Sequence, residues 1–133
     1  AVSVMDIAER KACETSEKVR RRVIAAREAQ KMRFEAAGYG PESNIFTNAD
    51  IPAAEIENII KLDDAARELI KKSAERFKLS ARAYHRTLRV AQTIADLALV
   101  QKNIAKITLN EVKKPLEEAF IAQALSYRRQ VLN

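Results

Sequence analysis

The sequence predicts an all-α protein, a bundle of about five helices in one domain. Only two of its 133 residues are glycine and three are proline, which leaves little material for the turns of an all-β fold. Hydrophobic residues make up 47% of the chain, enough for a buried core, and good helix formers such as alanine, leucine and glutamate are abundant. A chain of this length usually folds as one domain.

Start and stop signals place the first helix. Residues 1–14 are expected to form a lead-in arm of weak helical character, and residues 15–133 a single helical domain. Thr15 or Ser16 is the predicted N-cap of the first helix, and Gly38 is predicted to end it. Its buried side is expected to carry Val19, Val23, Ala26 and Ala29 or Gln30.

The rest of the chain carries signals for four more helices and one extra turn. The stretch over 38–50 holds both glycines and Pro41, and it is the predicted loop. The elements expected after it are a short helix capped by Asp50, a helix from Leu62 or Asp63, a helix over 81–100 capped by Ser80, a turn at 108–111 and a last helix from Pro115 to about Gln130. The buried face of the 81–100 helix is expected to hold Tyr84, Thr87, Leu88, Ala91, Ile94, Ala95 and Ala98.

The stretch "LSARAYHRTLRVAQTIADLA" (79–98) places three arginines in one stripe of the predicted helix. Arg82, Arg86 and Arg89 lie within about 60° of one another, opposite the apolar face. Ser80 as N-cap leaves free N–H groups at the helix start, where the helix dipole attracts an anion. Arg82 lies in that first turn, so its guanidinium and the helix end could bind one phosphate. The alternative is an ordinary solvated surface.

Charge is distributed in blocks along a chain whose net charge is +6. Residues 10–33 and 71–92 are strongly basic, whereas residues 34–70 are strongly acidic. This pattern suits an anionic partner such as DNA, but it also suits salt bridges between helices. The candidates for contacts with a nucleic-acid backbone are Arg20, Arg21, Arg22 and Arg27. The alternative is that this face pairs with the acidic segment.

Several functional motifs are absent from the sequence. No glycine-rich phosphate loop, CxxC or HExxH motif occurs, so no metal site, no cofactor and no self-contained enzyme is expected. His85 is expected to be a surface or packing residue. Cys13 stands alone and cannot form an intramolecular disulfide, which suits a reducing cytoplasm. No apolar run approaches the length that crosses a membrane.

The 79–98 stretch resembles the hallmark of the C-terminal domain in magnesium-chelatase-like AAA+ proteins, the YifB/ComM family. The likeness includes "ETSEKVRRRVIAAREAQKMRF" (14–34) and continues, in the same order, through "NADI" (48–51), "LDDAARELI" (62–70) and "FIAQALSYR" (120–128). Where the family reads VARTIADL, this chain has Gln92 in place of the arginine. The segment between Ala98 and Ala119 is also longer than in the family.

The resemblance implies a helical lid that closes over nucleotide held by a separate AAA+ core domain. It implies that Arg82 is the sensor 2 arginine, which contacts the terminal phosphate, with Arg86 and Arg89 close to the nucleotide. ATP and Mg²⁺ would be bound by the core, so the full-length protein would be the ATPase. ComM-like relatives are hexameric helicases that move DNA branches, whereas chelatase subunits insert Mg²⁺ into a porphyrin, and the 79–98 stretch looks more like the helicase branch.

Two other classes of function remain open at this stage. A chain that starts at Ala1 suggests a piece of a longer protein, which agrees with a lid. The first alternative is a stand-alone basic helical module that binds nucleic acid without ATP. The second is an interaction domain whose charged blocks only pair its own helices.

Overall fold

The computed structural model describes residues 4–103 and 105–132, with side chains described from Ser16 to Arg128 except Ile104. Within these residues the fold is entirely helical, apart from one isolated β-bridge. The α-helices are α1 (Val4–Ala36), α2 (Ile56–Ile59), α3 (Asp64–Phe77), α4 (Ala81–Lys102), α5 (Leu109–Val112) and α6 (Glu118–Leu132), and the short 3-10 helices are η1 (Pro41–Ser43), η2 (Asn48–Asp50) and η3 (Ala53–Glu55). The all-α prediction is confirmed.

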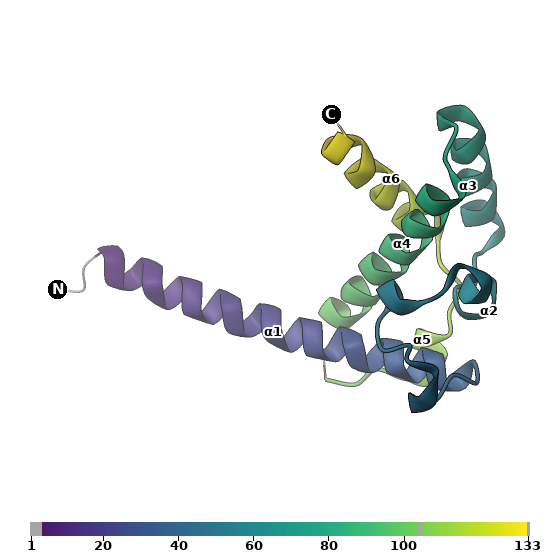
Figure 1. The fold of residues 1–133 in the computed structure, drawn as a ribbon. Helices are drawn as coiled ribbons and strands as arrows, with labels where there is room; N and C mark the ends of the chain where they lie inside the picture. Colours follow the sequence, from purple (N-terminus) through teal and green to yellow (C-terminus); the bar gives the residue numbers. More distant parts are fainter. Residues whose placement is uncertain (1–3, 104, 133) are drawn as a thin grey trace.

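Helix α1 is one continuous helix whose N-terminal half extends away from the rest of the molecule (Figure 1). The helix start predicted at Thr15 or Ser16 is therefore wrong, because α1 runs through both residues. No glycine or proline precedes them, and extending a helix already formed is easier than starting a new one. The division into an arm over 1–14 and a domain over 15–133 stays a prediction.

The C-terminal end of α1 and the loop after it follow the sequence signals closely. Gly38 takes a positive φ of 93°, and the Tyr39 amide donates to the Phe34 carbonyl at 2.9 Å, which closes the helix end. Asp50 is the last residue of a capping box: its carboxylate accepts a hydrogen bond from the amide of Thr47, three residues earlier, at 3.0 Å. It therefore belongs to η2 rather than starting a new helix.

Helix α3 begins close to its predicted start, with Asp63 as its N-cap, and α4 begins at the predicted cap Ser80. The Asp63 carboxylate accepts a hydrogen bond from the Ala66 amide, and the Ser80 hydroxyl accepts one from the Ala83 amide at 3.1 Å. Between the two helices Lys78 takes a left-handed conformation, which lets the chain reverse direction. These caps fix the position of the α4 N-terminus.

The last helix begins later than predicted. α6 starts at Glu118 and not at Pro115, because Leu116 pairs with Leu62 in a parallel β-bridge. The Leu116 amide donates to the Lys61 carbonyl at 2.7 Å, and the Asp63 amide donates to the Leu116 carbonyl at 3.1 Å. The predicted turn at 108–111 is confirmed as α5, with a capping box between Thr108 and Glu111.

The core lies where α4 packs against both α1 and α6, and α3 also packs against α6. Figure 1 shows α4 crossing the middle of the molecule. The main cluster is completed by apolar residues of the loop that follows α1. Val19, which was predicted to be buried, is 43% exposed, on a part of α1 that extends from the other described elements, and Ala98 is exposed as well. The buried members of the cluster are Phe34, Ile45, Ile51, Ile56, Ile59, Ile60, Ala66, Ile70, Leu88, Ala91, Leu116, Ile121 and Ala124.

Candidate functional site

A groove of about 300 Å³ runs along the N-terminal half of α4 and the C-terminal part of α6. Its floor is apolar, formed by small and branched side chains such as Ala83, Val90 and Ala124. Three arginines line it: Arg82 and Arg86 from α4 and Arg128 from α6. Among the described side chains no carboxylate lines this groove, and its arginines favour an anion.

The predicted stripe of three arginines divides into two groups. Arg82 and Arg86 are exposed, and neither has a hydrogen-bond or ion-pair partner among the described residues. Arg89 is half-buried, and its Nε donates to the Ile51 carbonyl at 2.9 Å. Arg89 therefore links α4 to the loop before α2 by a hydrogen bond, whereas Arg82 and Arg86 remain available to a ligand.

Arg128 is the residue of this groove that sequence reasoning did not select. It is half-buried, one position after the exposed Tyr127, in the part of α6 that faces the start of α4. Arg128 is visible in the "ALSYR" stretch (124–128). The periodicity of one helix, however, does not show that this residue will lie close to the arginines of another helix.

A buried ion pair between Arg33 and Asp96 links α1 to α4, and it was not predicted either. The side chains are 7% and 1% exposed, and Nη1 of the arginine lies 3.0 Å from the carboxylate. Nε of Arg33 donates to the Val112 carbonyl of α5 at 3.2 Å. Amide groups of Asn48 and Gln92 also donate to Asp96, at 3.0 and 3.2 Å. Gln92 therefore supports this network.

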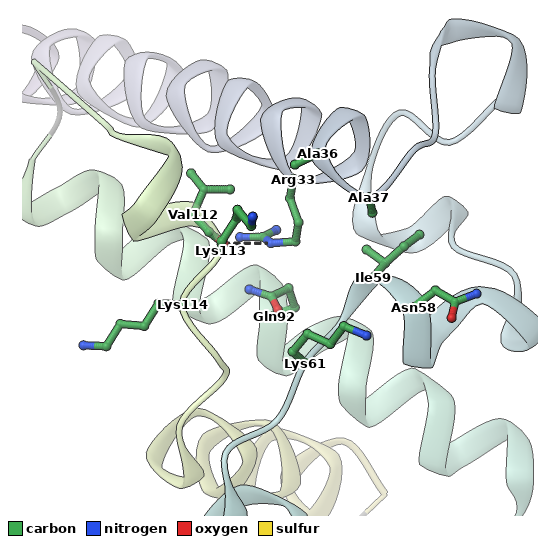
Figure 2. A pocket seen from close by; sticks show the side chains of 10 residues that line it. All are labelled: Arg33, Ala36, Ala37, Asn58, Ile59, Lys61, Gln92, Val112, Lys113 and Lys114. Carbon is green, nitrogen blue, oxygen red and sulfur yellow. Dashed lines mark hydrogen bonds between the residues drawn. The ribbon is translucent and has the colours of Figure 1, made fainter.

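A second cleft, of about 160 Å³, lies beside this ion pair and carries three lysines (Figure 2). Arg33 is already neutralised by Asp96, and Nζ of Lys61 donates to the Glu57 carbonyl at 2.9 Å. Lys114 points away from the cleft and pairs with Glu117 at 3.4 Å (Figure 2). Among the described residues this leaves Lys113 as the one cleft cation with no partner, which makes the cleft a weaker anion site than the groove.

Four arginines of α1 were predicted to contact a nucleic-acid backbone. Arg20, Arg21 and Arg27 are exposed, and Arg22 is half-buried. In the described part of the chain, none of them forms an ion pair with residues 34–70. Both the nucleic-acid role of these four arginines and its alternative therefore stay predictions.

The perturbed pKa values lie outside the groove. The Tyr39 hydroxyl donates to the Glu55 carboxylate, which lowers the pKa of Glu55 and raises the pKa of Tyr39. The hydroxyl and amide of Thr108 lower the pKa of Glu111 in the α5 capping box. Both carboxylates hold loops in place, and neither is positioned for acid–base chemistry at the arginines.

Two sequence candidates remain, His85 and Cys13. His85 packs edge-on against Tyr84, with ring centroids 5.7 Å apart, in the packing role that was expected. The side chain of Cys13 lies outside the described side chains. No cluster of three potential metal-ligating side chains occurs in the described part. None of the helices in that part combines the length and apolarity needed to cross a bilayer.

The fold and groove define a small all-α domain with an arginine-lined surface at the start of a capped helix. The family model for magnesium chelatase, subunit ChlI C-terminal, matches residues 13–128. The chain is 35% identical to competence protein ComM of Haemophilus influenzae over 118 residues, which cover 89% of this chain and 19% of that protein. The chain therefore belongs to the magnesium chelatase ChlI C-terminal family.

Other relatives match a shorter stretch. Uncharacterized proteins of Mycobacterium bovis and Mycobacterium tuberculosis are 35% identical over 85 residues, which cover 64% of this chain and 16% of each relative. The chain thus spans less than a fifth of the length of these curated relatives. No solved structure matches the chain at a significant level.

Proposed function

We propose that this domain is the C-terminal lid of a magnesium-chelatase-like AAA+ ATPase and that Arg82 is its sensor 2 arginine. The observation that carries the proposal is that Arg82 is exposed in the first turn of α4, without a carboxylate partner in the described part of the chain. An arginine with no described partner, beside two others in a groove that no described carboxylate lines, suits a phosphate oxygen. Membership of the family supports the same assignment.

The start of α4 adds to the positive potential of the arginine. The Ser80 hydroxyl accepts a hydrogen bond from the Ala83 amide only, so the amides before Ala83 in the first turn of α4 are left for an anion. The helix dipole also favours negative charge at this end of the helix. The guanidinium of Arg82 would stabilise the charge that develops on the terminal phosphoryl group during its transfer. Mg²⁺ prefers carboxylate and phosphate oxygens, and the described lining of the groove has no carboxylate, so we expect the core domain to hold it together with ATP.

We further propose that the full-length protein works as a ring-shaped homo-oligomer in the cytoplasm, and that it moves DNA branches as a helicase. The 79–98 stretch, which resembles the helicase-type branch of the family, supports this proposal, as does the identity with competence protein ComM. The partner of the lid would be the protein's own AAA+ core. The stand-alone nucleic-acid-binding module is the competing function.

The test is a steady-state ATPase comparison of full-length variants. Arg82→Ala should lower the rate of ATP hydrolysis by roughly 10³-fold, as the loss of an arginine that stabilises phosphoryl transfer can do. Its free energy of unfolding should change by no more than about 0.5 kcal/mol, because the side chain is exposed and unpaired. Arg86→Ala should have a smaller effect, because it lies one turn further from the helix start.

Arg67→Ala is the matched control, because Arg67 is an exposed arginine of α3 outside the groove. It should leave both the rate and the melting temperature unchanged. If Arg82→Ala hydrolyses ATP as fast as the parent, Arg82 is an ordinary surface residue and the sensor assignment is wrong.

A further inference from the structure

Arg128 of α6 occupies a position at which helix packing favours an apolar side chain. At 100° per residue, Ile121, Ala124 and Arg128 lie within about 60° of one another on α6. Ile121 and Ala124 are buried where α6 packs against its neighbours α4 and α3. The next residue on this face is instead a half-buried arginine that lines the groove. Departures from the apolar pattern at such positions are expected at functional sites.

The groove brings three arginines together without a described counter-charge. Arg82 and Arg86 lie one turn apart on α4, and Arg128 reaches the same groove from α6. In the described part of the chain, Arg128 forms no ion pair, and no carboxylate lines the groove. Like charges in one groove repel one another, and partial burial weakens the solvation of a charged group. An anion bound between the two helices would offset both costs.

We propose that Arg128 is a second phosphate-binding arginine, which holds a non-transferred phosphate of the nucleotide whose terminal phosphate Arg82 contacts. This inference rests on the proposed function, because it takes that nucleotide as the occupant of the groove. A triphosphate chain carries more anionic oxygens than one guanidinium can bind, so arginines from two helices can bind it together. The groove volume of about 300 Å³ suits part of a nucleotide.

The two arginines should act on different kinetic constants. Arg82 would contact the phosphoryl group that is transferred, so it stabilises the transition state more than the bound substrate. Arg128 would contact a phosphate that remains in the product ADP, so it binds substrate, transition state and product alike. Uniform binding of this kind lowers KM and leaves kcat nearly unchanged. Arg128 therefore sets the affinity for the nucleotide, whereas Arg82 sets the rate.

The experiment compares full-length variants by calorimetric titration with ADP in the presence of Mg²⁺ and by steady-state ATP hydrolysis. Arg128→Ala should weaken ADP binding at least about tenfold, as the loss of a charge-assisted hydrogen bond does, and raise KM more than it lowers kcat. Arg128→Lys keeps the charge but loses the planar fork, so its affinity for ADP should be intermediate. Arg82→Ala and the control Arg67→Ala should bind ADP as tightly as the parent.

The melting temperature of the nucleotide-free protein distinguishes binding from a structural role. Because Arg128 has no described partner, Arg128→Ala should melt with the parent when no nucleotide is present, and ADP should stabilise it less. A lower melting temperature with unchanged ADP affinity would overturn the inference, as would a loss confined to the binding of duplex DNA. If Arg128→Ala binds ADP normally while Arg82→Ala hydrolyses ATP slowly, only this inference fails. A parent that binds no ADP would refute the proposed function as well.

Discussion

Removing the carboxylate of Asp96 should destabilise the domain more than the loss of any exposed ion pair. The side chain is 1% exposed and accepts hydrogen bonds from Arg33, Asn48 and Gln92. Asp96→Ala leaves the Arg33 guanidinium buried with the Val112 carbonyl as its remaining acceptor. Breaking a buried pair in this way costs about 3–5 kcal/mol, because one charge is left uncompensated.

The assay is urea denaturation followed by circular dichroism, with Glu68→Ala as the control. The Glu68–Lys72 pair lies on the surface at 3.7 Å, so its loss should change the free energy of unfolding by less than about 1 kcal/mol. In an Arg33→Ala background, Asp96→Ala should lower the free energy of unfolding much less, because no unpaired guanidinium is then left buried. The coupling energy from this double-mutant cycle should be about 2 kcal/mol. If Asp96→Ala and Glu68→Ala destabilise the domain equally, the proposed role of the network is wrong.

Three further predictions concern local geometry. Ser80→Ala should lower the stability by about 1 kcal/mol, measured by urea denaturation, because the Ala83 amide loses its acceptor; an unchanged midpoint would contradict the cap. Gly38→Ala should cost about 1–2 kcal/mol because alanine is strained at a φ of 93°, although the space around it is open. In Tyr39→Phe the pKa of Glu55, followed by NMR, should rise towards its ordinary value. A carboxyl group whose pKa is lower in the folded than in the unfolded protein stabilises the fold at pH values above its unfolded-state pKa, and this stability is lost as the pH falls through its folded-state pKa. Because the variant lacks part of this contribution, it should lose less stability on acidification than the parent.

Local signals were enough to predict most of the fold. Asp63, Ser80, Thr108 and Gly38 cap or end helices through bonds to residues nearby in the chain, and such bonds can be inferred from sequence. The start of α6 depends instead on a bridge between Leu62 and Leu116, which no local pattern reveals. The extension of α1 before residue 15 was missed because a good capping residue does not by itself stop a helix.

The candidate site could be predicted only where it lies on one helix. Arg82 and Arg86 follow from the spacing within α4, but Arg128 comes from α6, and its approach to the groove depends on tertiary packing. The pairing of Arg33 with Asp96 joins residues 63 positions apart. On sequence alone Arg33 was one basic residue among many in its block, and its burial could not be distinguished from the exposure of its neighbours.

The anchoring of α1 at Arg33 has a mechanical consequence. At 1.5 Å per residue, the helix reaches about 43 Å from this ion pair to its first turn at Val4. A rotation of about 10° at the ion pair would therefore move the far end by about 7 Å, with no change in the helix itself. Because this pair joins α1 to α4, any small reorientation of α4 that carried α1 with it would become a large displacement at the far end of α1.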